Sequence, residues 1–182
     1  MNDDHSSSVR LVVAPIEEPL TLSQTKTFLR IEHTADDDAI SRAITAARLA
    51  AEQYIRAVLL AQTWEYSIAN PSGSKLYLPW GPAQSITSIV LTTEAGATST
   101  LNAANYRLSV DGYAVLIEPF VSTEKMTVRY VAGMANSAAQ LPSSIVQGML
   151  HHITVMLENR NGAEPLPMQS IACYEPYRRM AL

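Results

Sequence analysis

Two adjacent histidines are the side chains of this sequence best suited to bind a metal ion or to move a proton. His151 and His152 lie in a predicted helix, where neighbouring side chains point about 100° apart, so the two rings do not face a common ion. Neither histidine has a second histidine or a carboxylate four residues away. Zinc sites and histidine catalysis both need such converging groups. The pair therefore predicts polar or half-buried helix positions.

The other reactive side chains also lack the neighbours that chemistry requires. The run Asp36–Asp38 has neither the alternating spacing nor the glycine of a calcium loop, and it stands where carboxylates favour a helix start. Cys173 is the only cysteine, which excludes a disulfide within the chain and a zinc site made of cysteines. No glycine-rich phosphate loop and no Gly-x-Ser-x-Gly elbow occur. We expect no catalytic residue, no cofactor, no metal and no enzymatic activity.

The composition is that of a moderately acidic globular chain. Its 182 residues are 47% hydrophobic and 16% charged, and 17 acidic residues oppose 13 basic ones, for a formal net charge of −4. That balance argues against a large basic face that grips DNA phosphates. The length favours one domain, with room for an inserted subdomain. The solidly apolar run Ile145–Leu157 is too short to span a bilayer, so we expect no membrane partner.

The first sixty residues predict an extended arm followed by helices. Residues 1–20 contain helix-breaking prolines and are expected to form the arm. Thr21 begins a Thr-x-x-Gln capping box that starts a helix. A second start is expected at Thr34, from which apolar residues recur with a helical period to about Leu60. Residues 21–61 therefore form the first part of a helical bundle, rich in alanine that permits close helix packing.

From residue 62 the apolar period changes to two, which predicts strands. Asp111-Gly112 lies between two such runs and is the strongest hairpin signal in the chain. About six short strands would form an antiparallel sheet or small barrel over residues 62–134. Helix returns over residues 135–162, where Gly148 implies a close contact, expected with the alanine-rich helix.

Residues 163–182 form a C-terminal segment. The expected fold class is therefore α+β: a small α-helical bundle with long N-terminal and C-terminal helices and an inserted antiparallel β-subdomain.

Four stretches carry motifs that are specific in their order and spacing. They are Glu18-Pro19-Leu20-Thr21-Leu22 through Leu29-Arg30-Ile31; Gln62-Thr63-Trp64-Glu65; Leu78-Pro79 with Gln84-Ser85-Ile86-Thr87-Ser88-Ile89, Asn105-Tyr106-Arg107 and Val128-Arg129-Tyr130-Val131-Ala132-Gly133; and Leu141-Pro142-Ser143-Ser144-Ile145 through Glu158-Asn159-Arg160, ending in Tyr174-Glu175-Pro176-Tyr177-Arg178. This order resembles the head–tail connector, or adaptor, family of long-tailed bacteriophages and gene transfer agents. The resemblance covers about Glu17 to Tyr177.

The resemblance implies a structural role in a phage-like particle. Proteins of this family form a ring, dodecameric like the portal, that sits below the portal vertex. The ring extends the DNA channel and offers a platform to stopper or tail-completion proteins. For this chain the resemblance implies a homo-oligomeric ring in the neck of a virion, assembled in the bacterial host cytoplasm, through which double-stranded DNA passes without specific binding.

The resemblance also implies where partners bind. The C-terminal segment of such proteins engages the portal protein, and residues 164–182 correspond to it here. The expected portal contacts are Ile171, Tyr174, Tyr177, Arg178 and Arg179. Neighbouring copies are expected to pack laterally through the long helices, with contacts at Arg42, Arg48 and Arg56. Arginine, aromatic residues and alanine-rich helices suit the heterologous interfaces that close a ring.

Two other functions remain open at this stage. One is a different neck or tail-completion protein of the same particle, which would contact tail proteins and not the portal. The other is an enzyme or ligand-binding domain with a site on the β-subdomain, around Trp64, Tyr77 and Trp80. The simpler interpretation of these aromatic residues is that they form the core of the sheet.

Overall fold

The computed structural model describes residues 6–159 and 165–179. These residues fall into two compact units. The β-unit contains residues 6–15 and 61–133, and the helical unit contains residues 16–60, 134–159 and 165–179. The helical unit is thus built from separated stretches of the sequence, and most of the β-unit is inserted between them.

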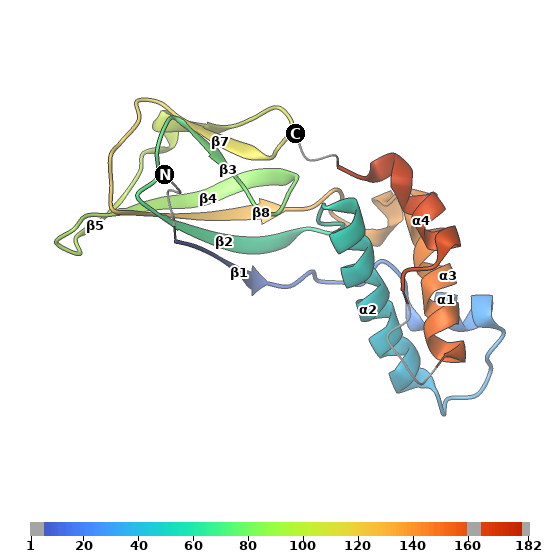
Figure 1. The fold of residues 1–182 in the computed structure, drawn as a ribbon. Helices are drawn as coiled ribbons and strands as arrows, with labels where there is room; N and C mark the ends of the chain where they lie inside the picture. Colours follow the sequence, from blue (N-terminus) through green and yellow to red (C-terminus); the bar gives the residue numbers. More distant parts are fainter. Residues whose placement is uncertain (1–5, 160–164, 180–182) are drawn as a thin grey trace. The chain divides into compact units, whose positions relative to one another are not determined.

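The β-unit consists of two antiparallel sheets, one of five strands in the order β1-β2-β8-β4-β5 and one of three in the order β3-β7-β6 (Figure 1). The strands are β1 (Ser7–Val13), β2 (Gln62–Ala69), β3 (Lys75–Tyr77), β4 (Ala83–Thr92), β5 (Thr98–Thr100), β6 (Tyr106–Leu108), β7 (Ala114–Ile117) and β8 (Lys125–Ala132). The described residues thus hold eight strands, whereas the sequence predicted about six. The two additional strands are β1, whose end at Leu11–Val13 the sequence allowed as a short edge strand of the arm, and β5; both are sheet edges with no buried residue.

The centre of the larger sheet follows the predicted period of two. On β8, Met126, Val128, Tyr130 and Ala132 are buried, and the residues between them are only partly covered. Val128 lies opposite Tyr66 on β2 and Ile89 on β4, so side chains from three strands share one buried face. This alternation confirms the strand prediction for this part of the chain.

The predicted hairpin at Asp111-Gly112 joins β6 to β7. Gly112 has a φ of +71°, a conformation that side chains with a Cβ rarely adopt. A Cβ at this position would also lie 2.8 Å from the carbonyl oxygen of Ala83. The Ala83 N–H donates a hydrogen bond of 2.7 Å to the Gly112 carbonyl. Glycine is therefore required both by the turn and by the close approach of β4.

The described residues of the helical unit form four α-helices where the sequence predicts helix, and together with the β-unit they confirm the α+β fold class. They are α1 (Leu22–Leu29), α2 (Asp37–Ile55), α3 (Ser143–Glu158) and α4 (Met168–Tyr174). The predicted capping box is present at the start of α1. The Gln24 N–H donates to Thr21 Oγ1 (3.1 Å), and the Thr21 N–H donates to Gln24 Oε1 (2.9 Å).

Both predicted limits of the second helix were wrong. Asp36, not Thr34, is the N-cap residue, and it makes no side-chain cap bond. The helix ends at Ile55 rather than near Leu60, because Arg56 adopts the left-handed conformation with a φ of +59°. Beyond this turn the Leu59 N–H donates a hydrogen bond to the Glu52 carboxylate of the same helix. No local pattern in the sequence indicates this contact.

The core of the helical unit combines one face of α2 with one face of α3. The contributing residues on α2 are Ile40, Ile44, Ala47, Ala51 and Ile55, and those on α3 are Ile145, Met149 and Ile153. Small alanines on α2 permit the close approach of α3 that the sequence suggested.

Gly148 contacts α4 and not the alanine-rich helix, which corrects the expectation from the sequence. A Cβ at Gly148 would lie 2.5 Å from Tyr174 Cε1 and 3.0 Å from Cys173 Cβ. The Ser170 hydroxyl donates a hydrogen bond of 2.8 Å to the Gly148 carbonyl. Glycine therefore lets α4 lie directly on α3, with the Tyr174 ring fully buried.

We expect Gly148→Ala to lower the free energy of unfolding by about 1–2 kcal/mol, although alanine is intrinsically the better helix former by about 1 kcal/mol. The reason is the clash with the immobile Tyr174 ring. In a Tyr174→Leu background the same alanine should be neutral or stabilising, and urea unfolding of the four proteins measures this coupling. Equal stability of Gly148→Ala and the parent chain would contradict this account of the packing.

Candidate functional site

The two histidines occupy different environments on α3. The His151 ring lies edge-on to Phe28, with centroids 6.3 Å apart, and its Nε2 is 3.1 Å from the Gln147 side-chain nitrogen. His152 is only 6% exposed, burial lowers its pKa, and its Nδ1 has no hydrogen-bond partner. Across the described ranges 6–159 and 165–179, no group of three or more His, Cys, Asp or Glu side chains could hold a metal ion.

The aspartate run serves the local structure of the helical unit. Asp37 Oδ1 is 2.6 Å from Lys26 Nζ, which also donates 2.8 Å to the His33 carbonyl. The pair joins the last turn of α1 to the first turn of α2. Asp37 and Asp38 both lie in that first turn, where the helix dipole favours negative charge. This placement agrees with the interpretation of the run as a helix start.

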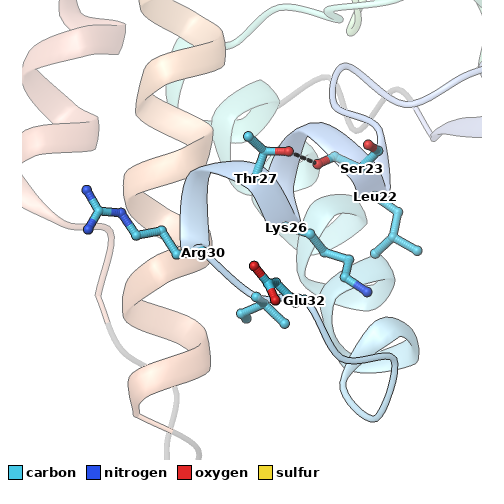
Figure 2. A pocket seen from close by; sticks show the side chains of 7 residues that line it. Leu22, Ser23, Lys26, Thr27, Arg30 and Glu32 are labelled. Carbon is cyan, nitrogen blue, oxygen red and sulfur yellow. Dashed lines mark hydrogen bonds between the residues drawn. The ribbon is translucent and has the colours of Figure 1, made fainter.

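An open hollow of about 710 Å³ lies along α1 and the turn that follows it (Figure 2). Its lining residues are Leu22, Ser23, Lys26, Thr27, Arg30, Ile31 and Glu32. The Lys26 ammonium is already engaged by Asp37, and the Thr27 hydroxyl donates 2.8 Å to the Ser23 carbonyl. Its polar groups do not converge on one point, so the hollow has no arrangement suited to catalysis.

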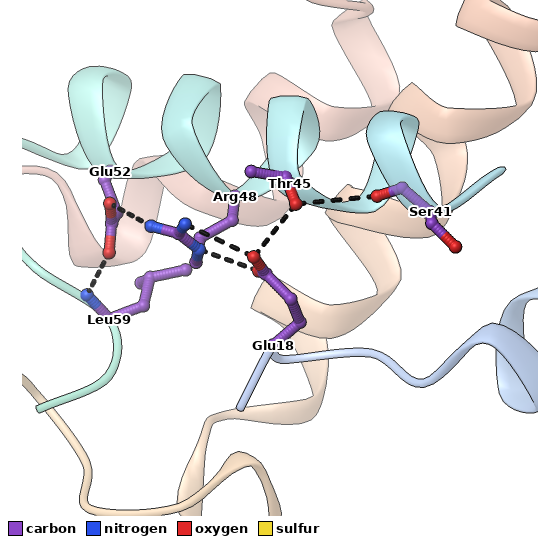
Figure 3. A network of polar contacts seen from close by, with 6 residues as sticks. All are labelled: Glu18, Ser41, Thr45, Arg48, Glu52 and Leu59. Atoms are coloured by element: carbon purple, nitrogen blue, oxygen red, sulfur yellow. Dashed lines mark hydrogen bonds and ion pairs between the residues drawn. The ribbon is translucent and has the colours of Figure 1, made fainter. Parts of the chain in front are cut away.

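An ion-pair network centred on a buried arginine lies in the C-terminal half of α2 (Figure 3). Arg48 Nε is 2.7 Å from Glu18 Oε2, and Arg48 Nη1 is 3.1 Å from Glu52 Oε2. Glu52 Oε1 accepts the Leu59 N–H at 3.0 Å, and the Thr45 hydroxyl donates to Glu18 at 3.0 Å. Burial opposes the charge on Arg48, but the bonds from Glu18 and Glu52 outweigh it and raise the pKa of the guanidinium.

Arg48 was expected to make a lateral contact with a neighbouring copy, and its position does not favour that role. The side chain is 7% exposed, and its hydrogen bonds are made to two carboxylates of its own unit. Arg42 on the same helix and Arg56 at its C-cap are both exposed. Arg48 differs from them in its two partners, Glu52 four residues later and the distant Glu18.

The five expected portal contacts differ in how accessible they are. Tyr174 is completely buried in the core of the helical unit. Ile171, Tyr177 and Arg179 are half-buried, and Arg178 is exposed. The Tyr177 hydroxyl accepts a bond of 3.0 Å from the Ser144 hydroxyl, and the Arg179 N–H donates 2.9 Å to the Ile55 carbonyl. The segment is therefore fastened to α2 and α3 while it presents Arg178 outward.

A second hollow, which we call the Tyr54 cleft, lies beside this segment within the helical unit. Its volume is about 420 Å³, and it is lined by Ala50, Gln53, Tyr54, Arg56, His152, Leu166 and Arg178. The Arg178 guanidinium lies over the Tyr54 ring at 4.9 Å from its centroid. The Tyr54 hydroxyl donates a short hydrogen bond to Glu175, which raises the pKa of Tyr54. No pattern in the sequence indicates this cleft, because its residues come from four separate places in the chain.

The aromatic residues considered as an alternative site on the β-unit divide into two groups. Trp64 and Trp80 stack with centroids 5.4 Å apart and are half-buried. Tyr77 is 62% exposed and lies under Lys75 Nζ at 4.7 Å. Trp64 lies opposite the buried Tyr130 of β8, whereas Trp80 lies outside the strands and Tyr77 is exposed, so only Trp64 is placed at the buried face of the sheet.

No helix within the described residues is both long enough and apolar enough to cross a membrane.

Comparison with known proteins identifies related sequences and folds. A profile of the family described as HCP, head completion protein, matches residues 18–154. No curated protein matches the sequence. A chain of the "Neck of empty GTA particle computed with C6 symmetry" shares 21% identity and a TM-score of 0.82, with 96% of this chain and 97% of that chain covered.

Two further structures share this fold. A chain of the "Virion of native gene transfer agent (GTA) particle" has 22% identity and a TM-score of 0.80, with 96% of both chains covered. A chain of the "Neck of native GTA particle computed with C12 symmetry" has 21% identity and a TM-score of 0.69, with 96% of this chain and 97% of that chain covered.

We expect Arg48→Met to lower the free energy of unfolding by about 3–5 kcal/mol, because it leaves two carboxylates without their shared cation. Arg10→Met is the matched control, since the Arg10–Glu65 ion pair is exposed, with 68% of the arginine side chain accessible. That control should lose no more than about 1 kcal/mol. Urea unfolding at neutral pH measures both values, and similar losses for the two variants would refute the importance of the buried network.

We expect His152→Leu to weaken the pH dependence of stability. In the unfolded chain a histidine titrates near pH 6.5, and burial lowers the pKa of His152 in the fold. Below about pH 6.5 the unfolded chain therefore binds the additional proton, and the free energy of unfolding falls as the pH falls. Urea unfolding at about pH 7.5, 6.5 and 5.5 should show a smaller fall for His152→Leu. Parallel curves for the two proteins would disprove the assignment.

Proposed function

We propose an adaptor role for this chain, which belongs to the head completion protein family. Family membership makes it a structural protein of a phage-like particle that acts at the junction of head and tail, and not an enzyme. The resemblance to connector-type proteins that the sequence suggested is thereby confirmed. The finer assignment, a ring placed directly beneath the portal, is our proposal.

In this proposal twelve copies form a closed ring in the neck, between capsid and tail, after assembly in the bacterial host cytoplasm. The symmetry is supported by the fold, which is shared with chains of gene transfer agent necks described with sixfold and twelvefold symmetry. The ring extends the DNA channel and carries the stopper or tail-completion protein. A formal net charge of −4 suits a wall along which double-stranded DNA slides without being held.

The observation that carries the portal assignment is the way the C-terminal segment is held. Tyr174 is buried and acts as the internal anchor of the segment rather than as a contact. Around this anchor the half-buried Ile171, Tyr177 and Arg179 and the exposed Arg178 are the residues that we propose to contact the portal. Arginine and tyrosine are common at the centres of protein interfaces, and a preorganised base lowers the entropy lost on binding.

Lateral contacts in the ring are proposed on the exposed face of α2. Arg42 and Leu49 lie seven residues apart on this helix and are both exposed. An exposed leucine near an arginine suits an interface that is apolar at its centre and charged at its rim. Arg56, expected from the sequence as a further lateral contact, lies beyond the end of α2 and lines the Tyr54 cleft instead. Closure of a ring requires that this face meet a different surface of the next copy.

Negative-stain electron microscopy of the chain mixed with the portal of the same particle tests the proposal. We expect a second ring stacked on the narrow end of the portal. Removal of residues 175–182 should leave a folded chain, because Tyr174 is retained, but should abolish the second ring. Circular dichroism checks the folding of the truncated chain, and Arg107→Gln, an exposed change on β6, is the control that should still bind.

Two outcomes would contradict the adaptor assignment. If competent portals remain bare beside the intact chain, the chain is a tail-side neck or completion protein. If the folded truncated chain still forms the second ring, the C-terminal segment is not the portal contact.

A further inference from the structure

The Tyr54 cleft combines a hollow with two arginine side chains whose charges its own unit neutralises only in part. Arg56 makes no ion pair with any residue in the described part of the chain, and it lies at the C-terminal end of α2. Arg178 is 3.8 Å from Glu175, at the outer limit of an ion pair, and is exposed. Glu175 is in turn held by the Tyr54 hydroxyl. The cleft therefore offers two guanidinium groups and one carboxylate, Glu175, which the Tyr54 hydroxyl already engages.

The cleft is also lined by a buried histidine, His152, whose ring has an unpartnered nitrogen. Its side chain is more than nine-tenths buried, it lines the cleft, and its Nδ1 has no hydrogen-bond partner. Buried polar atoms without partners are rare in native proteins, and each one left unpaired is costly. The favourable interaction of Arg56 with the α2 dipole accounts for a cation at this helix end. It does not account for an unpartnered imidazole at the wall of a hollow.

The rest of the lining limits the class of ligand. Ala50, Leu166 and the Tyr54 ring form apolar wall, and Gln53 adds an amide that can donate or accept. A planar guanidinium binds a carboxylate through two parallel hydrogen bonds, and an apolar wall strengthens such a pair by excluding water. A DNA backbone instead needs repeated cations along an open face, and this chain is acidic overall.

We propose that the Tyr54 cleft binds an acidic segment of the portal protein, with a partner carboxylate placed between Arg56 and Arg178. This inference rests on the proposed function, because the cleft adjoins the C-terminal segment that we assign to portal docking, and Arg178 belongs to both. The carboxylate supplies an anion to Arg56, and a second anion to Arg178 beside the distant Glu175. Neighbouring atoms of the segment fill the space beside His152. The proposal names the chemistry of the partner surface: aspartate or glutamate flanked by small apolar residues.

The test measures the affinity of the full chain for the portal, by biolayer interferometry, at about 50, 150 and 300 mM NaCl. Arg56→Gln removes one cation from an exposed position and should weaken binding about tenfold at the lowest salt, the usual effect of losing one charge-assisted hydrogen bond. Arg56→Gln combined with Arg178→Gln should weaken it further and flatten the salt dependence. Arg107→Gln is the matched control, because it removes an equally exposed charge from the β-unit.

The three possible outcomes distinguish portal binding in the cleft from portal binding elsewhere and from no portal binding. Weaker, less salt-sensitive binding by the two cleft variants and unchanged binding by Arg107→Gln would support the proposal. Tight portal binding that Arg56→Gln and Arg107→Gln leave equally unchanged would overturn it while the adaptor assignment stands. No portal binding by the intact chain would remove the adaptor assignment itself.

Two control measurements identify other occupants of the cleft. If Arg56→Gln abolishes self-association in mass photometry but leaves portal affinity unchanged, the cleft takes a second copy of this chain. If it abolishes binding to a duplex DNA fragment at about 150 mM NaCl, the cleft takes a nucleic-acid backbone. Either result would overturn the proposal.

Discussion

The ion-pair network of Glu18, Arg48 and Glu52 is the interaction on which the rest of this structure depends. Three segments of chain pass between the two units, near residues 15, 60 and 134. Glu18 lies just after the first and is bound by Arg48, while the Leu59 N–H lies just before the second and is bound by Glu52. Met134, at the third, donates to the Val58 carbonyl beside them. The buried arginine on α2 therefore binds the first segment directly and the second through Glu52, and the third is hydrogen-bonded to the residue next to Leu59.

The features that could be predicted from the sequence are those encoded within a few residues. The capping box at Thr21 and the hairpin at Gly112 each depend on local backbone chemistry, and both formed as expected. The end of α2 could not be predicted in this way, because the left-handed Arg56 is followed by chain that Glu52 binds from within the helix. Likewise Gly148 signalled a close contact, but only the fold identifies Tyr174 as the neighbour.

At the candidate site, the sequence indicates the type of each residue, but only the fold shows whether that residue is buried or exposed. The sequence singled out Tyr174 and Arg178 together as aromatic and basic side chains near the C-terminus. In the fold one is the buried anchor of the segment and the other is its exposed surface, four residues later. Arg42, Arg48 and Arg56 are residues of the same type, yet Arg48 is paired with carboxylates inside the helical unit and Arg56 lines a cleft. The local pair of Arg48 with Glu52 is visible in the sequence, but the burial of Arg48 also depends on Glu18, which lies thirty residues earlier.

The parallel bridge between Leu60 and Ala135 has a consequence for how proteins of this architecture can diversify. The chain leaves the helical unit and returns to it at adjacent points, so an inserted module needs only two closely spaced ends to fit there. A β-unit of another size could replace the present one without repacking α2 against α3, provided that β1 were exchanged along with it. The β-unit and the helical unit can therefore change in sequence and size independently of each other, because the insertion point places few demands on the inserted module.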